Sequence, residues 1–306
     1  MKVSIVIPVY NSEKIVTTTV NEIIKVLNTT SYTFEIILIN DGSPDNSWNV
    51  IKELANNNNN IISINLHKNY GQHNAVLCGF ENASGDYIVT MDDDMQNPPS
   101  ELIPLINSIV GTNYDLVFGK FKEKKHAQHR KLGSKVVGYL NAKVFNKPKD
   151  VTLTNFRIIK RDVIEKIINY KTSYPYIPGL ALMFASKIKN VEVEHAERTI
   201  GQSNYTFKKI FQLVSRLMIN YSSFPLRVLS SFGFLIAGIS FTIGITLIIK
   251  QILFGSKVQG WTSIMVLLSF FSGFIIILLG IIGEYLSRIL DQLSSHKSYH
   301  IREIIK

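Results

Sequence analysis

The first 119 residues alternate short apolar runs with segments of helical periodicity, and this alternation restricts the possible folds more than any other feature of the chain. The runs expected to form strands are Val3–Val9, Phe34–Asn40, Ile61–Leu66, Tyr87–Met91 and Asp115–Gly119. The helices expected between them cover about 12–27, 45–55, 72–83 and 99–110, with Ser12 as the cap of the first. Repeating strand–helix units of this length predict an α/β fold, in which a mostly parallel, doubly wound sheet carries helices on both faces.

Polar residues follow each of the first four strands. These strand ends are Tyr10-Asn11, Asn40-Asp41-Gly42, His67-Lys68-Asn69 and Asp92–Gln96. Ligands of parallel sheets bind beyond the carboxyl ends of the strands, so we expect the functional site where these four ends meet. The glycine-rich sequences of dinucleotide-binding and P-loop enzymes are both absent. A nucleotide diphosphate that is bridged by a metal ion and held by carboxylates remains compatible with the sequence.

Three consecutive acids directly follow the fourth strand. In extended chain alternate side chains point to the same side, which would place Asp92, Asp94 and Gln96 together. Two carboxylates and an amide oxygen suit a hard divalent cation, Mg²⁺ or Mn²⁺, whose remaining ligands come from phosphates. The alternative is an acidic loop that caps a helix and faces solvent. The polar strand ends around these acids favour the metal site.

The charge balance favours an anionic partner. Lysine and arginine number 33 against 23 acids, a formal net charge of +10, which suits nucleic acid, a phosphorylated substrate or an anionic membrane surface. A basic run over residues 120–135 is either a solvated surface or an anion-binding segment. The single cysteine, Cys78, rules out an intrachain disulfide and cysteine-rich zinc sites. Because the chain passes from Met1-Lys2 directly into strand-like sequence, without a signal peptide, the N-terminal domain is expected in the cytoplasm.

Two segments near the C-terminus, residues 228–249 and 262–283, contain no charged residue. Each is about 22 residues long, which is enough to cross the hydrocarbon core of a membrane. The short connection Lys250–Trp261 carries fewer basic residues than the outer flanks, which predicts that both termini are cytoplasmic. The amphipathic segment Phe207–Tyr221 is expected to lie in the membrane interface. Two buried core helices are the alternative to a membrane hairpin.

The expected organisation therefore has four parts. These are a cytoplasmic catalytic domain over residues 1–204, an interfacial helix over 205–227, a two-helix transmembrane hairpin over 228–287 and a cytoplasmic tail over 288–306.

Five motifs resemble the family 2 glycosyltransferases, which have a GT-A fold. They are Ile-Pro-Val-Tyr-Asn11, Asn-Asp-Gly-Ser43, Met-Asp-Asp-Asp-Met-Gln96, Arg198-x-x-Gly-Gln-Ser-Asn-Tyr205 and Gly-Glu-Tyr-Leu-Ser-Arg288. Within that family, the motifs resemble most specifically the polyisoprenyl-phosphate glycosyltransferases, the group that contains bactoprenol glucosyltransferases and dolichol-phosphate mannose synthases. This similarity runs nearly end to end. It implies an inverting enzyme of the cell membrane that moves one sugar from a nucleotide diphosphate, with UDP-glucose as first choice, to a polyprenyl phosphate for cell-envelope glycan modification.

The resemblance also implies roles for individual residues. The positions that hold the base and ribose match Pro8, Tyr10, Glu13 and Asp41, and those that hold the metal and diphosphate match Asp92, Asp94 and Gln96. The further substrate-binding candidates are Lys68, Arg130, Lys131, Ser134, Arg198, Ser203 and Tyr205. Many relatives carry an acid where this chain has Asn155. A phosphate acceptor is already ionised at neutral pH, so no strong general base is required, and Asn155 would orient the acceptor or the sugar.

Two other functions stay open. A processive polysaccharide synthase typically shows Gln-x-x-Arg-Trp, whereas neither Trp48 nor Trp261 follows an arginine here. A catalytically idle membrane adaptor would bind a nucleotide or a partner protein, but the acids at 92–94 argue against it. The expected spans and the lack of an aromatic–basic pattern disfavour a nucleic-acid binder. The expected partners are a nucleotide sugar, a polyprenyl phosphate and the membrane, with self-association through the transmembrane helices left open.

Overall fold

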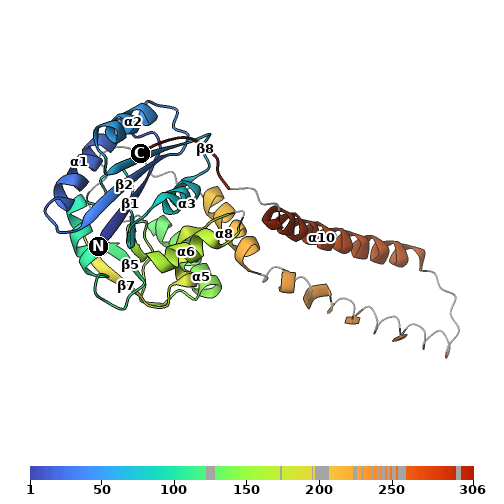
Figure 1. The fold of residues 1–306 in the computed structure, drawn as a ribbon. Helices are drawn as coiled ribbons and strands as arrows, with labels where there is room; N and C mark the ends of the chain where they lie inside the picture. The colour runs from blue at the N-terminus through green and yellow to red at the C-terminus, as the bar shows by residue number, and fades with distance from the viewer. Residues whose placement is uncertain are drawn as a thin grey trace. The chain divides into compact units, whose positions relative to one another are not determined.

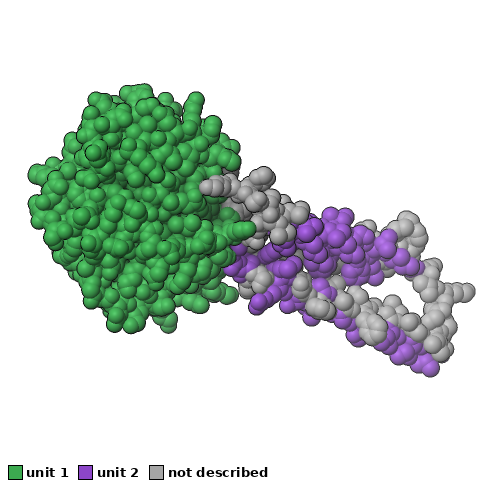
Figure 2. All heavy atoms as spheres, viewed as in Figure 1, with its two compact units in different colours: residues 1–214, 297–306 green, residues 215–296 purple. Residues whose placement is uncertain are grey.

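The chain forms two compact units in the computed structural model. The structure describes residues 1–121, 128–172, 174–194, 196, 207–222, 260–293 and 298–306, with shorter stretches and single residues between 226 and 253. Unit 1 consists of residues 1–214 together with 297–306, and unit 2 of residues 215–296 (Figure 2). The last residues of the chain, which we expected to be a tail, thus belong to the same unit as the first.

An eight-stranded sheet forms the framework of unit 1, in the order β7-β5-β6-β4-β1-β2-β3-β8 (Figure 1). The strands are β1 (Lys2–Val9), β2 (Thr33–Asn40), β3 (Ile61–Leu66), β4 (Tyr87–Thr90), β5 (Leu116–Phe121), β6 (Arg157–Lys160), β7 (Ile188–Val193) and β8 (Ile301–Ile305). All neighbours pair in parallel except β6 and β8, which run antiparallel to the strands beside them. The predicted α/β fold with a mostly parallel sheet is confirmed.

Helices cover both faces of this sheet. The helices that the structure describes before residue 222 are α1 (Val16–Leu27), α2 (Ser47–Asn57), α3 (Gln72–Asn82), η1 (Pro99–Glu101), α4 (Leu102–Asn107), α5 (Gln128–Phe145), α6 (Arg161–Asn169), α7 (Ile177–Phe184) and α8 (Phe207–Tyr221). The last of these, α8, runs from unit 1 into unit 2. Buried residues of α1, α2 and α4 join one apolar cluster with β1 and β2. On the other face, α3 packs against β1 and β2, where Gly79 brings its backbone close to Val6 and Ile39. Since β1 is buried on both faces, its sequence is continuously apolar from Ile5 to Val9 rather than alternating.

The prediction that Ser12 caps the first helix was wrong. Helix α1 begins at Val16, and no side chain caps it. The backbone carbonyl of Ser12 accepts hydrogen bonds from the N–H groups of Ile15 and Val16, while its hydroxyl donates to the carbonyl of Tyr10. The side chain of Ser12 therefore stabilises the loop after β1 and leaves the helix end to the backbone.

Two strands occupy places that the repeating pattern did not predict. Strand β6 lies between β4 and β5, so that β5 is not a neighbour of β4 as a simple β-α repeat would have it. Thr90, the last residue of β4, pairs with Arg157, the first residue of β6. The residues that precede β6 therefore lie at the carboxyl end of β4. Strand β8 closes the other side of the sheet by pairing with β3. Both are antiparallel additions whose position depends on contacts distant in sequence.

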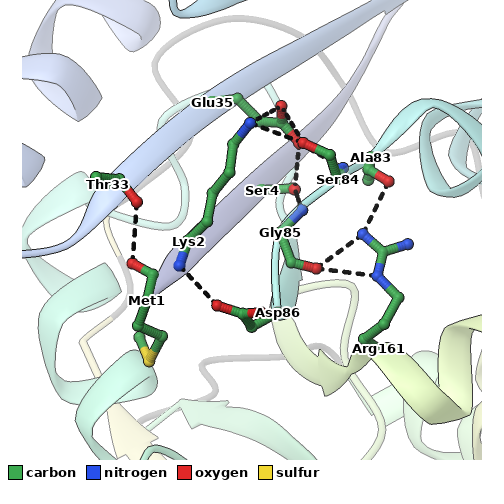
Figure 3. A network of polar contacts seen from close by, with 10 residues as sticks. All are labelled: Met1, Lys2, Ser4, Thr33, Glu35, Ala83, Ser84, Gly85, Asp86 and Arg161. Carbon is green, nitrogen blue, oxygen red and sulfur yellow. Dashed lines mark hydrogen bonds and ion pairs between the residues drawn. The ribbon is translucent and has the colours of Figure 1, made fainter.

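A polar network ties the amino ends of the central strands together (Figure 3). The buried carboxylate of Glu35 in β2 accepts hydrogen bonds from the hydroxyl of Ser4 at 2.6 Å and from the backbone N–H of Ser84 at 2.6 Å. It also pairs with the ammonium of Lys2 at 2.7 Å. Arg161, at the start of α6, donates to the carbonyls of Ala83 and Gly85. The network joins β1, β2, the loop before β4 and α6 at the end opposite the polar strand ends.

Helix α10 (Trp261–Leu293) is the principal element of unit 2. Large apolar side chains exposed along it are Ile264, Leu267, Leu268, Ile275, Ile276, Ile277, Leu279, Ile282, Leu286 and Ile289. Judged by length and hydropathy together, none of the helices in the described part of the chain qualifies as a membrane-spanning segment. The spans expected at 228–249 and 262–283 stay predictions, and much of the first lies outside the described residues.

Candidate active site

The carboxyl ends of β1, β2, β3 and β4 lie side by side, as expected for adjacent parallel strands. The register pairs Val9 with Asn40, and the N–H of Asp41 donates to the carbonyl of Val9. Asn40 and Asn65 are joined by a buried side-chain hydrogen bond of 2.8 Å, which fixes the ends of β2 and β3 to each other. The residues after these strands are therefore held at one edge of the sheet.

Asp41 fastens the loop between β3 and α3. Its side chain is 3% exposed, and its two oxygens accept hydrogen bonds from the N–H groups of Tyr70, at 2.7 Å, and Gly71, at 2.9 Å. Burial raises the pKa of the Asp41 carboxyl, and the two N–H groups partly oppose that rise. The next residue, Gly42, has a φ of +63°, and a Cβ there would lie 2.4 Å from the backbone of the 67–71 loop. Only glycine permits so close an approach of the two loops.

Two side-chain amides contact Asp92, the first of the three acids after β4. One of its oxygens accepts a hydrogen bond from the amide of Gln72 at 2.6 Å, and the other contacts the amide of Asn155 at 3.4 Å. Burial, followed by the charge of Asp94, raises the pKa of the Asp92 carboxyl. We had not predicted Gln72; its position directly after a glycine, at the first turn of α3, was the available signal.

The prediction that Asp92, Asp94 and Gln96 point to one side assumed that the chain stays extended after β4. The backbone does not stay extended there. Strand β4 ends at Thr90, and Met95 has a φ of +60°, which turns the backbone sharply. One oxygen of Asp94 accepts a hydrogen bond from the N–H of Gln96 at 3.2 Å. Asp93 turns inward, and burial raises the pKa of its carboxyl to about 7, with Asp92 and Asp94 adding to the rise and the Ser12 hydroxyl opposing it.

A pocket of about 220 Å³, counting space open to solvent, lies behind Asp92. It is lined by Pro8, Gln72, His73, Val76, Thr90, Met91, Asp92, Asn155 and Arg157. The guanidinium of Arg157 is 1% exposed, and its Nε has no hydrogen-bond partner among the described residues. Burial lowers the pKa of Arg157 to about 10, so it stays charged at neutral pH. A buried cation therefore faces the same pocket as the Asp92 carboxylate.

His73 forms the aromatic wall of this pocket. Its ring meets the rings of Tyr176 and Tyr174 edge-on, with centroids 5.3 and 6.0 Å away. Burial and then the charge of Arg157 lower the pKa of His73 to about 4, so its imidazole is neutral at physiological pH. Neither His73 nor Arg157 was predicted from the sequence, because neither forms a recognisable motif before β6 is seen beside β4.

The remaining predicted site residues are distributed as follows. Pro8 lines the pocket and Tyr10 is 51% exposed at the end of β1. Glu13 accepts a hydrogen bond from the N–H of Asn46 at 2.9 Å, at the start of α2. The ammonium of Lys68 lies 5.3 Å from the ring centroid of Tyr70. The backbone of Arg130, Lys131 and Ser134 belongs to α5, whereas Arg198, Ser203 and Tyr205 lie outside the described residues.

The acids after β4 fit a divalent cation that takes most of its ligands from a substrate. Within the described ranges no group of three or more His, Cys, Asp or Glu side chains comes together at metal-binding distance. Burial raises the pKa of Asp92, and repulsion by the charge of Asp94 adds to that rise. A cation between them would remove that repulsion, and phosphate or water oxygens would complete its coordination.

Comparisons with known proteins agree with this geometry. The family model described as "Glycosyl transferase family 2" matches residues 4–168. Undecaprenyl-phosphate 4-deoxy-4-formamido-L-arabinose transferase from Proteus mirabilis is 34% identical over 99% of this chain and 94% of its own length. The protein of the same name from Photorhabdus laumondii subsp. laumondii is 32% identical over the same shares.

Among solved structures, the fold is similar to that of glucosyl-3-phosphoglycerate synthase from Mycobacterium tuberculosis, crystallised with Mn²⁺, uridine-diphosphate and phosphoglyceric acid. The TM-score is 0.52 at 16% identity, covering 71% of this chain and 76% of that one, which supports the GT-A fold alone. The resemblance drawn from the motifs is confirmed: the chain belongs to the family 2 glycosyltransferases.

Proposed function

We propose that the protein transfers a single sugar from a nucleotide-diphosphate sugar to a polyprenyl phosphate, with inversion at the anomeric carbon. The observation that carries the proposal is that Asp92, two residues before Asp94, lines a pocket at the carboxyl edge of the sheet in a family 2 chain. Two relatives that match 99% of the chain are named for transfer to undecaprenyl phosphate, which supports this choice of acceptor.

The residues around Asp92 account for the chemistry that such a transfer needs. When bound, Mg²⁺ or Mn²⁺ would neutralise charge on the diphosphate leaving group. The amide of Gln72 orients one Asp92 oxygen at 2.6 Å, and Asn155 lies 3.4 Å from the other. An ionised phosphate acceptor is already a nucleophile, so the side chains have to position it and need not remove a proton. Asn155 would orient the acceptor or the sugar through its amide.

The identity of the donor sugar is the finer part of the proposal. UDP-glucose is the donor that the family resemblance implies, with the base near Asp41. The two relatives are named for 4-deoxy-4-formamido-L-arabinose. A nucleotide-activated form of that sugar therefore belongs beside UDP-glucose in the first donor panel.

We also propose that residues 228–249 and 262–283 insert into the cell membrane, with the catalytic domain and both termini in the cytoplasm. Neither segment contains a charged residue. The large apolar side chains along α10 support this proposal, because so many would be unfavourable in contact with water. Placing the site at the inner leaflet would also let it reach the phosphate of a lipid whose chains stay in the bilayer.

A reporter inserted into the connection Lys250–Trp261 should therefore be extracytoplasmic, and one fused after Lys306 should be cytoplasmic. The excess of basic residues on the outer flanks is the physical reason. Paired phosphatase and fluorescent-protein fusions, each active on one side of the membrane, measure this directly. Phosphatase activity at the C-terminal fusion, with none at the loop, would overturn the topology.

The acceptor is tested by comparing undecaprenyl phosphate with a water-soluble sugar or protein. Arg130→Ala and Arg198→Ala should each lower transfer to the lipid about tenfold or more, since a charge-assisted hydrogen bond to phosphate is lost. Donor binding should change less. Lys25→Ala, an exposed lysine of α1, is the matched control and should behave like the wild type. Equal transfer to the soluble acceptor would contradict the lipid assignment.

The same assays separate the other two functions. A polysaccharide synthase would add more than one sugar to each acceptor, which mass spectrometry of the product detects. An idle adaptor would bind nucleotide without transfer to any acceptor.

A further inference from the structure

The C-terminal strand β8 reaches the loop on which the candidate donor site depends. After unit 2 the chain returns to unit 1 and pairs with β3 along Ser63–Leu66, with a register shift between Asn65 and Leu66. An ion pair of 2.5 Å between Glu303 of β8 and Lys52 of α2 holds the strand to the neighbouring helix. Tyr299, just before β8, is 1% exposed. The segment is thus anchored along its length.

Contacts of this segment continue past the end of β3 into the loop of residues 67–71. The N–H of His67 donates to the carbonyl of His300 at 3.0 Å. The ring of His300 meets the ring of Tyr70 edge-on, with centroids 6.4 Å apart at an angle of 60°. The side chain of His300 is otherwise exposed. One side of the loop is therefore supported by residues from the very end of the chain.

The other side of the loop is part of the candidate site. Asp41 accepts hydrogen bonds from the N–H groups of Tyr70 and Gly71. The residue that follows, Gln72, donates to Asp92 at 2.6 Å. The loop thus lies between His300 on one side and two candidate substrate-binding carboxylates on the other. A shift of Tyr70 would move a hydrogen-bond donor of Asp41 and the start of α3 together.

We propose that His300, directly before β8, is a positioning residue for the donor nucleotide. His300 holds Tyr70 in place, and the ordered loop then keeps Asp41 and Gln72 in the arrangement that binds the nucleotide. A site that is already ordered does not have to lose conformational freedom on binding, so it binds more tightly than a mobile one. This inference rests on the proposed function, because it assumes that the edge of the sheet binds a nucleotide.

The test uses the full-length protein in detergent micelles and titration calorimetry with UDP and with GDP, each in the presence of Mn²⁺. His300→Ala should weaken nucleotide binding about threefold to tenfold, the range expected for one lost aromatic contact. The apparent Tm should stay that of the wild type, because the removed side chain is exposed. Arg302→Ala, exposed on the same strand, is the matched control and should bind like the wild type. In turnover assays the KM of the donor should rise while kcat changes little.

A double variant checks the route through the loop. If His300 acts through Tyr70, then His300→Ala should weaken binding no further in a Tyr70→Ala background. Additive losses, or wild-type affinity in His300→Ala, would overturn the inference while leaving the proposed function intact. If the wild type binds neither nucleotide and transfers no sugar, the proposed function fails, and this inference fails with it.

Discussion

Asp94→Ala should reduce kcat/KM for sugar transfer about a thousandfold, the scale expected when charge stabilisation of a transition state is removed. Burial raises the pKa of Asp92 and the charge of Asp94 adds to that rise, so a cation bound between the two carboxylates would be stabilised by both. Without Asp94 the diphosphate leaving group would lose part of its counter-charge. Asp92→Ala should also weaken transfer, as should Gln96→Ala, by smaller factors. Steady-state transfer assays over a range of Mg²⁺ and Mn²⁺ concentrations measure these losses.

The control for this series is Glu53→Ala, which removes an exposed acid from α2. Its activity should equal that of the wild type. Activity of the wild type should disappear with excess chelator and return when Mg²⁺ or Mn²⁺ is restored. Full turnover in excess chelator would refute the hypothesis that Asp92 and Asp94 act by holding a divalent cation.

The largest effect on stability is expected from Glu35→Ala. This substitution should lower the free energy of unfolding by about 2–4 kcal/mol, because it leaves polar partners of a buried carboxylate without an acceptor. The affected partners are the hydroxyl of Ser4, the backbone N–H of Ser84 and the ammonium of Lys2 (Figure 3). Urea unfolding followed by circular dichroism measures the change. Glu22→Ala, in an exposed pair with Lys25, should alter stability by less than about 0.5 kcal/mol.

The pH dependence of stability gives a second readout for Glu35. Burial alone would raise the pKa of its carboxyl, but Lys2, Ser4 and Ser84 together hold that pKa below its ordinary value of 4.5. The contribution of Glu35 is therefore complete above pH 4.5 and is lost as the pH falls through the lower pKa of the folded state. The stability difference between the wild type and Glu35→Gln should shrink over that acidic range. A difference that stays constant down to the acid unfolding of both proteins would argue against the network.

The sequence was informative where local pattern determines structure. The strand–helix alternation predicted β1 to β4 and the helices between them, since each apolar run and each periodic segment is a local signal. Placing the site at the carboxyl edge needed only the parallel arrangement of these strands. The motif residues Asp41 and Asp92 do lie at that edge, beside Gly42 and Thr90.

The rest depended on contacts between distant parts of the chain. Nothing in residues 157–160 indicates that β6 enters between β4 and β5, and this insertion is what brings Arg157 to Asp92. Gln72 and His73 were missed because only the fold shows what the first turn of α3 faces. The side-chain alternation assumed after β4 failed at Met95, where the backbone adopts a positive φ. The tail expected at the C-terminus is a strand because β3 has an open edge for it to pair with.

Because β8 pairs with the sheet of unit 1, the chain between residues 215 and 296 can follow only certain paths relative to a membrane. Residues 1–214 and 297–306 fold as one body, and a folded domain cannot lie on two sides of a bilayer at once. Any path from residue 215 to residue 296 must therefore end on the side where it began. The number of membrane crossings along that path is even by topology alone, whatever the hydropathy of any one helix. If residues 228–249 and 262–283 both cross the membrane as proposed, a variant with one of them deleted would have to give up either the remaining crossing or the last strand of the sheet.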